Sequence, residues 1–232
     1  MNAEKYSKVI TIILIILIIG IVAGAGVLGI NFLKKQKQDA RMKKEKEEFD
    51  KVVEENQSII EEENDDKDKK EDEDEGFSVE KTEHPDQGTG QQIKKPRNEE
   101  GYIISGYITI PKTNVSLPIL DTYSAEAIET GVAVLWPTNP KLNEPGNTVI
   151  VGHNYKDGRF FSNNKKLSTG DKIRIKDLTG RELTYTIYDK FEASPSDASF
   201  YARDTNGAVE ITLSTCTDDA KLRTIIVARV EE

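Results

Sequence analysis

The single cysteine of this 232-residue chain, Cys216, lies in an apolar, β-branched run at residues 211–217. Such a run predicts a strand that ends near the thiol. Arg223 follows seven residues later, a spacing that suits a short turn and a returning strand over residues 222–230. We therefore expect Cys216 and Arg223 to be neighbours on adjacent strands. A thiol becomes a useful nucleophile beside a base or in a positive field, and an arginine supplies such a field.

A base for this thiol has two candidates, because the chain contains two histidines. His84 lies in a polar, Pro/Gly-rich stretch that we do not expect to be ordered. His153 follows the apolar run 148–152, which predicts a buried strand. Cys216, His153 and Arg223 therefore form a candidate cysteine-nucleophile site. On spacing alone the ordinary alternatives stay open, namely a cysteine that packs as a small hydrophobe, a structural histidine and a solvated arginine.

Two motifs around these residues resemble those of the sortases. Residues 212–216, Thr-Leu-Ser-Thr-Cys, together with Arg223 are similar to the Thr-Leu-x-Thr-Cys … Arg signature of that family. Residues 151–154, Val-Gly-His-Asn, are similar to its histidine motif. The resemblance covers residues 100–232 and implies a transpeptidase that needs no metal or organic cofactor. It implies Cys216 as the nucleophile, His153 as general base and then general acid, and Arg223 as the cation that holds the substrate and the developing oxyanion.

Other features of the chain refine this resemblance. Thr215 is a candidate substrate-binding residue, with strand packing as its alternative. Residues 152–162 resemble the class B pattern, whereas the connection at residues 193–206 is short, as in classes A and D. We expect that connection to help form the groove for the sorting signal. Some sortases bind calcium through acidic loop residues, for which Glu144 and Asp197 are the candidates here, although we predict no metal site.

An apolar run at residues 9–33 follows a short N-terminal tail, residues 1–8. A helix rises about 1.5 Å per residue, so this run exceeds the roughly 30 Å hydrocarbon core of a bilayer. We predict an uncleaved membrane anchor, with a cleavable signal peptide as the alternative because of the small residues at 23–25. Lysines crowd the C-terminal flank of the run, which by the positive-inside rule places that side in the cytoplasm. The resemblance instead implies an extracellular catalytic domain that faces the cell wall.

Residues 34–98 are rich in lysine and glutamate, with sparse apolar positions spaced for a single amphipathic helix or a weak coiled coil. The stretch from 61 to 75 is dense in carboxylates, repels itself and cannot bury a core. We interpret the region as a charged stalk, helical in part and disordered in part. The net charge of −9 comes largely from it, and the chain has no basic stripe of the kind that binds nucleic acid.

From residue 99 to 232 the sequence changes to short strands separated by turn signals. Strands are predicted at 103–110, 115–120, 132–136, 148–152, 172–177, 182–192, 208–215 and 222–230. Residues 124–130 predict a helix capped by Ser124 and stopped by Gly131, and a second short helix is expected near 160–167. This pattern predicts a mainly β fold, a closed eight-stranded β-barrel with one or two short helices.

The whole pattern predicts a membrane-anchored sortase. It would cleave an LPxTG-like or NPxTN-like sorting signal through a thioacyl intermediate on Cys216 and transfer the acyl group to an amine of cell-wall peptide. Two other functions stay open. One is a cysteine peptidase that only hydrolyses, and the other is a non-enzymatic, membrane-tethered β-barrel that binds a ligand.

Overall fold

A computed structural model describes residues 3–71, 93–135 and 141–231. His84 and the part of the predicted stalk at residues 72–92 lie outside these residues. The chain forms two compact units, Met1–Glu45 and Lys46–Glu232. The long helix α1 (Ala3–Glu71) supplies the described residues of the first unit and the beginning of the second. In the described part of the chain, no helix combines the length and the apolar content that a membrane crossing requires.

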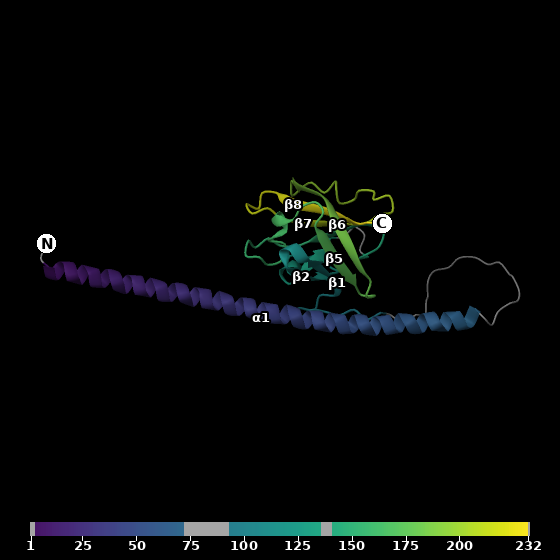
Figure 1. The fold of residues 1–232 in the computed structure, drawn as a ribbon, viewed down its shortest axis with the longest axis horizontal. Helices are drawn as coiled ribbons and strands as arrows, with labels where there is room; N and C mark the ends of the chain where they lie inside the picture. The colour runs from purple at the N-terminus through teal and green to yellow at the C-terminus, as the bar shows by residue number, and fades with distance from the viewer. Residues whose placement is uncertain (1–2, 72–92, 136–140, 232) are drawn as a thin grey trace. The chain divides into compact units, whose positions relative to one another are not determined.

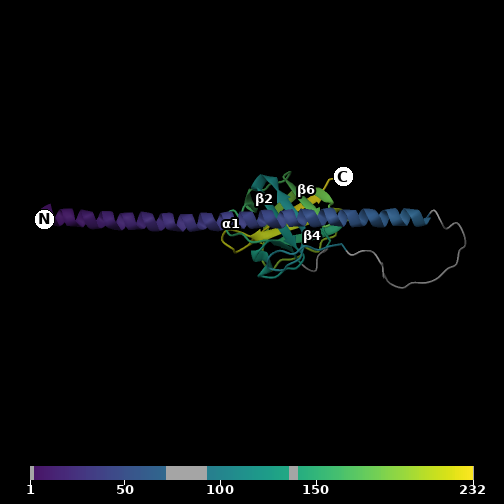
Figure 2. The same ribbon diagram turned by 90° about the horizontal axis from the view of Figure 1, so that it is seen from below.

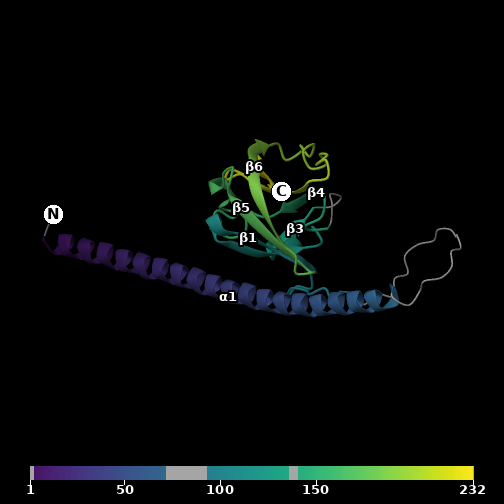
Figure 3. The ribbon, with the colours of Figure 1, turned by 45° about the vertical axis from the view of Figure 1, so that its right-hand side comes forward.

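The second unit contains a closed barrel of eight strands, as predicted. Neighbouring strands follow the order β1-β2-β3-β4-β7-β8-β6-β5, and β5 pairs with β1 to close the sheet (Figure 1, and turned by 45° in Figure 3). The strands are β1 (Ile104–Ile110), β2 (Val115–Leu120), β3 (Val132–Val134), β4 (Gly146–Val151), β5 (Lys172–Asp177), β6 (Glu182–Ala193), β7 (Val209–Cys216) and β8 (Arg223–Val230).

Two of the strand pairs are parallel, β2 with β3 and β4 with β7, and the other six are antiparallel. Figure 2, seen from below, shows β2, β4 and β6 on this barrel. The parallel pair of β4 and β7 matters most for the candidate site, because parallel strands end at the same edge of a sheet. The segments that follow β4 and β7 therefore emerge together.

The helices within the barrel are single 3₁₀ turns: η1 (Pro111–Thr113), η2 (Ala127–Glu129) and η3 (Asn164–Lys166). The helix predicted at 124–130 is thus shorter than expected. Its N-cap residue is Glu126, not the predicted Ser124, and the N-cap side chain makes no capping hydrogen bond. The Ser124 Oγ still accepts a hydrogen bond of 3.0 Å from the Ala127 N–H. The short helix expected near 160–167 corresponds to η3. A run this short forms one tight turn and then continues into the next strand.

β-branched side chains fill the barrel interior. Ile108, Ile119, Ile150, Ile173 and Ile226 are all fully buried, and they come from five different strands. Such side chains lose little rotamer freedom in a strand and pack closely on a pleated surface. The tight interior fixes the relative positions of the strands, and with them the positions of the residues at the strand ends.

One face of α1 also packs against the barrel within the second unit. Phe49 and Val53, four residues apart, are fully buried in a cluster with Tyr107 and Leu178. The rings of Phe49 and Tyr107 lie 4.9 Å apart. The sequence predicts the helix and assigns it to a stalk, and the stalk assignment stays a prediction. The structure adds that part of its apolar face is covered by the barrel.

Asn56 completes this contact. Its Nδ2 donates hydrogen bonds of 3.0 Å to both Lys94 O and Leu178 O, and its Oδ1 accepts one of 2.7 Å from the Lys94 N–H. The side chain is fully buried. A buried amide with all of these partners orders the chain after residue 93 against the helix, because any shift would leave polar groups unpaired.

Candidate active site at the ends of β4 and β7

The candidate nucleophile lies where β7 ends. Cys216 is the last residue of β7 and pairs directly with Arg223, the first residue of β8. The turn between the strands is closed by a hydrogen bond of 2.9 Å from the Thr217 N–H to Leu222 O. The prediction that Cys216 and Arg223 are neighbours on adjacent strands is therefore confirmed. Residues paired directly in an antiparallel sheet point to the same face, so both side chains reach one surface.

The Arg223 side chain donates a hydrogen bond from Nη1 to the Sγ of Cys216. Both residues are half-buried. A guanidinium keeps its charge at every pH at which proteins function, so the sulfur lies in a permanent positive field. The remaining N–H groups of the fork are of the kind that stabilises an oxyanion formed beside the sulfur.

β4 brings His153 to the same end of the barrel. Val151 of β4 lies opposite Ser214 of β7, and the Gly152 N–H donates a hydrogen bond of 3.2 Å to Ser214 O. His153 is two residues beyond Val151, as Cys216 is two residues beyond Ser214. Neighbouring strands are about 4.8 Å apart, so the histidine and the cysteine leave the sheet from the same level of adjacent strands.

Gly152 is required for this path of the chain. A Cβ at this position would lie 2.8 Å from Val132 Cγ1 and 2.9 Å from Phe161 Cδ2. Real Cβ atoms do not approach other carbons so closely, and both neighbours belong to the packed core. The glycine therefore lets the chain pass directly over the core into His153.

Asn154 connects the histidine segment to the end of β7. Its Nδ2 donates to Cys216 O at 2.9 Å and to Asp218 Oδ1 at 3.0 Å, and its Oδ1 accepts from the Lys156 N–H at 3.0 Å. Lys165 forms an ion pair of 2.5 Å with Asp218. The hydrogen bonds from Lys165 and Asn154 lower the pKa of Asp218. The asparagine of the Val-Gly-His-Asn motif thus fixes the backbone of the candidate nucleophile.

Glu129, the last residue of η2, faces the imidazole of His153. Its Oε1 lies 3.2 Å from His153 Nε2, at ion-pair distance but outside hydrogen-bond geometry, and its Oε2 accepts a hydrogen bond from the Tyr155 hydroxyl. The rings of Tyr155 and His153 lie 4.9 Å apart. Burial and the hydrogen bond to Glu129 raise the pKa of Tyr155 to about 12. Sequence reasoning missed both residues, because Glu129 is one of many carboxylates and its contact with His153 is long-range.

A cavity of about 170 Å³ opens beside Cys216. Thr215, Thr224 and Glu192 line it as one row across three strands, since Thr215 pairs with Thr224 and Thr224 pairs with Glu192. The Thr215 hydroxyl is buried and has no hydrogen-bond partner among the described residues. The structure thus places Thr215 beside the candidate nucleophile, and its contact with substrate stays a prediction. The other lining residues are Asn154, Phe161, Lys165, Thr217 and Asp218.

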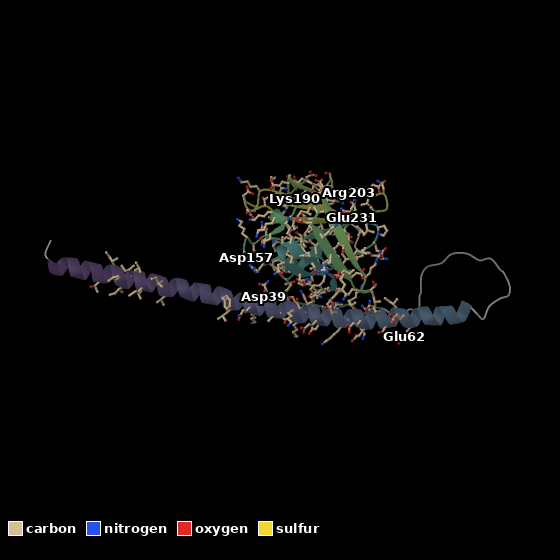
Figure 4. The ribbon with its side chains drawn as sticks, viewed as in Figure 1. Asp39, Glu62, Asp157, Lys190, Arg203 and Glu231 are labelled. Carbon is tan, nitrogen blue, oxygen red and sulfur yellow. The ribbon has the colours of Figure 1, made fainter. Side chains whose placement is uncertain are left out.

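The connection between β6 and β7, residues 194–208, is anchored to β7. The Tyr201 hydroxyl donates a hydrogen bond of 2.9 Å to Ser214 Oγ. Arg203, labelled in Figure 4, forms an ion pair with Glu210 and donates a hydrogen bond of 2.9 Å to Thr212 Oγ1. The connection therefore forms a fixed wall next to the strand that carries the cysteine.

The two acidic residues considered as calcium ligands have other partners. Glu144 lies 3.7 Å from Arg181, and Asp197 Oδ1 accepts hydrogen bonds from the N–H and the hydroxyl of Ser199. Within the described ranges, no group of three or more His, Cys, Asp or Glu side chains could hold a metal ion.

Comparison with known proteins identifies the architecture. The family model described as "Sortase domain" matches residues 108–231, which is more than half of the chain. Among curated proteins, Sortase D of Bacillus subtilis (strain 168) is 29% identical over 131 residues, which are 56% of this chain and 62% of that relative. The chain therefore spans less than two thirds of the length of the curated relative it matches.

Solved structures show the same fold. A Clostridium perfringens structure described as a Sortase D5 transpeptidase is 30% identical, with a TM-score of 0.51 over 56% of this chain and 79% of that one. The structure of sortase C-1 from Actinomyces oris is 27% identical, with a TM-score of 0.50 over 55% of this chain and 73% of that one. Both matches are similar in coverage to the family-model match.

Proposed function

Because this chain belongs to the sortase family, we propose that it is a cysteine transpeptidase with Cys216 as its nucleophile. The observation that carries the proposal is the hydrogen bond from Arg223 to the Sγ of Cys216, at the sheet edge to which β4 also delivers His153. Thioacyl chemistry needs a thiol, a group that takes and returns its proton, and a donor for the oxyanion.

The proposed reaction has two steps, formation of a thioacyl enzyme and its attack by an amine, and the same groups act in both. His153 takes the proton of the Cys216 thiol, and the sulfur attacks the carbonyl carbon of the scissile peptide bond. Arg223 stabilises the resulting oxyanion. When the C–N bond breaks, His153 returns the proton to the leaving amine, and a thioacyl enzyme remains. An incoming amine then attacks the thioester and transfers a proton to His153, which passes it to the departing sulfur.

The acyl donor in this proposal is the C-terminal sorting signal of a secreted surface protein, of the LPxTG-like or NPxTN-like kind. The acceptor is an amine of cell-wall peptide. Support comes from the family and from the apolar cluster near the nucleophile, in which Phe191, Phe200 and Tyr201 pack on Ala193 and Ile225. The short connection at residues 194–208 and the relatives named sortase D favour classes A and D over class B.

We further propose that residues 9–33 anchor the chain in the cell membrane, with the catalytic domain outside and facing the wall. The apolar composition of this run supports the proposal, as do the exposed side chains of Ile13, Ile16 and Ile19 in α1. Several side chains of the run lie outside the described residues. Protease added to intact cells should remove a C-terminal tag. A tag that is cut only after the membrane is opened would reverse the orientation.

A panel of fluorogenic peptides tests the activity of the full chain. The panel contains LPxTG-like and NPxTN-like sequences, each with and without an oligoglycine or a diaminopimelate-type amine. We expect cleavage of one motif, an acyl adduct on Cys216 by mass spectrometry, and ligated product when the matching amine is present. The control is Cys216→Ala, which should lose the cleavage and the adduct.

The other outcomes separate the alternatives. Cleavage with an adduct but no ligation to any amine would favour a peptidase that only hydrolyses. No cleavage and no adduct on Cys216 with any peptide would overturn the proposal and leave the non-enzymatic binding function.

A further inference from the structure

The two ring nitrogens of His153 have different surroundings. Nε2 is buried and lies 3.2 Å from Glu129 Oε1. Nδ1 makes no hydrogen bond to any described residue. In a neutral imidazole, the partner of one nitrogen decides which nitrogen carries the hydrogen. The surroundings of Nε2 therefore determine what Nδ1 can do.

Neighbouring residues hold the Glu129 carboxylate and the turn that carries it. Its second oxygen accepts the Tyr155 hydroxyl, and the Tyr155 ring lies against the His153 ring. The guanidinium of Arg159 lies 4.4 Å from the Tyr155 ring centre. The turn that carries Glu129 is also fixed. The Thr130 hydroxyl donates a hydrogen bond of 2.8 Å to Ala127 O and accepts one of 2.9 Å from Asn98 Nδ2.

Exposure of the carboxylate alone would argue for a weak contact. The Glu129 side chain is 57% exposed, and exposed ion pairs contribute little to stability. The burial of Nε2 changes this assessment, because a buried N–H without an acceptor costs free energy. Glu129 is the acceptor within reach. A small rotation of its carboxylate would complete the hydrogen bond, and such bonds are often misaligned until substrate binds.

We propose that Glu129 is the positioning residue for His153 in the proposed transpeptidase reaction, on which this inference rests. Its carboxylate accepts a hydrogen bond from Nε2–H and so leaves Nδ1 as the nitrogen that exchanges the proton. Nδ1 takes the proton from the Cys216 thiol, and the imidazolium formed is paired through Nε2–H with Glu129. Nδ1 then gives that proton to the leaving amine, and the imidazole returns to its starting form with Nε2–H intact.

Nitrogen-15 NMR of histidine reads this arrangement directly and needs no substrate. The chain has only two histidines, so a His84→Ala background leaves the His153 signals alone. In the full-length protein we expect neutral His153 to carry its hydrogen on Nε2. Glu129→Gln should give a mixture of both tautomers, whereas Glu129→Asp should largely retain the Nε2–H form. Glu126→Gln is the matched control, because it removes an exposed carboxylate from the same turn.

Kinetics provide the second readout. A misplaced proton-transfer group costs up to about 100-fold in rate, so Glu129→Gln should lower kcat for peptide cleavage by about 10- to 100-fold with little change in KM. Glu129→Asp should recover most of the loss, and Glu126→Gln should match the wild type. Thermal unfolding of each variant separates a loss of fold from a loss of positioning.

The tautomer result bears on the proposal independently of the peptide assay. A wild-type His153 that carries its hydrogen on Nδ1 would overturn it, even if Glu129→Gln failed to fold. The proposal would also be overturned if Glu129→Gln left both the His153 tautomer and kcat unchanged. If no peptide is cleaved by the wild type but the tautomer is as expected, the proposed function fails and the Glu129–His153 pairing stands.

Discussion

The buried amide of Asn56 at the helix contact differs in its hydrogen bonding from two buried polar atoms at the candidate active site. Asn56 in α1 is fully buried, and its amide donates two hydrogen bonds and accepts a third. Thr215 and His153 at the site also have buried polar atoms, yet Thr215 Oγ1 and His153 Nε2 have no hydrogen-bond partner within the described ranges.

This contrast separates what stabilises the fold from what is kept ready for a ligand. A satisfied buried amide rigidifies its surroundings, whereas an unsatisfied buried group costs free energy that the rest of the structure must offset. Native proteins tolerate such groups mainly at functional sites, where a ligand supplies the missing partner. Asn56 therefore stabilises the helix contact, whereas we propose that Glu129 is the partner of His153 Nε2 and that substrate is the partner of the Thr215 hydroxyl.

The largest effect is expected from Arg223→Lys. A lysine keeps the charge but loses the planar fork that donates to Cys216 Sγ and to the oxyanion. Removal of one oxyanion donor lowers kcat by about 10²- to 10³-fold. We expect a loss of that size in kcat/KM for the cleaved peptide, with an unchanged unfolding midpoint. Arg229→Lys, on the same strand, is the control. If Arg229→Lys lowered kcat/KM as much as Arg223→Lys does, the loss would not be specific to Arg223.

Asn56→Ala tests the other region. The substitution removes three hydrogen bonds and leaves the Lys94 and Leu178 backbone groups without these partners, which should lower the free energy of unfolding by about 2–3 kcal/mol. Chemical denaturation measures the loss. Ser58→Ala, an exposed position of the same helix, should change little. If the folded fraction of Asn56→Ala also cleaves peptide more slowly, the helix contact is coupled to the site and the two regions are not separate.

The sequence predicts the cysteine side of the site better than the histidine side. Cys216 and Arg223 are seven residues apart on two strands of one hairpin, so local spacing is enough to place them together. The eight strands are likewise predicted, because alternation and turn residues are local signals.

Glu129 and Asn56 show where local signals end. Glu129 reaches His153 across 24 residues of chain, and Asn56 reaches Leu178 across 122. Each is a common polar residue whose role depends on which distant segment the fold brings to it. The apolar positions around Asn56 predict an amphipathic helix, but one sequence does not specify what such a face packs against.

Thr215→Val tests whether the buried Thr215 hydroxyl contributes to substrate binding or to the stability of the fold. Valine has nearly the shape of threonine and removes a buried hydroxyl without a partner in the described structure, so the free energy of unfolding should stay constant or rise by about 1 kcal/mol. If the hydroxyl binds substrate, KM should rise by about 2- to 10-fold, which corresponds to one hydrogen bond. A loss of stability instead would mean that the hydroxyl has a structural partner.

The smallest effect is expected at Tyr155, where the readout is a titration. Its pKa is raised from the ordinary tyrosine value of 10.0 to about 12, because burial and the Glu129 carboxylate disfavour the phenolate. The stability that this shift contributes is present below pH 10 and is lost as the pH rises through about 12. Burial also raises the pKa of Tyr185 and Tyr188, so carbon-13 NMR of labelled tyrosines should show several late-titrating rings. The Tyr155 ring is the one that disappears in Tyr155→Phe, and it should titrate earlier in Glu129→Gln. A Tyr155 ring that titrates near pH 10 in the wild type would mean that the contact with Glu129 does not persist in solution, and the support that Tyr155 gives to Glu129 would be lost with it.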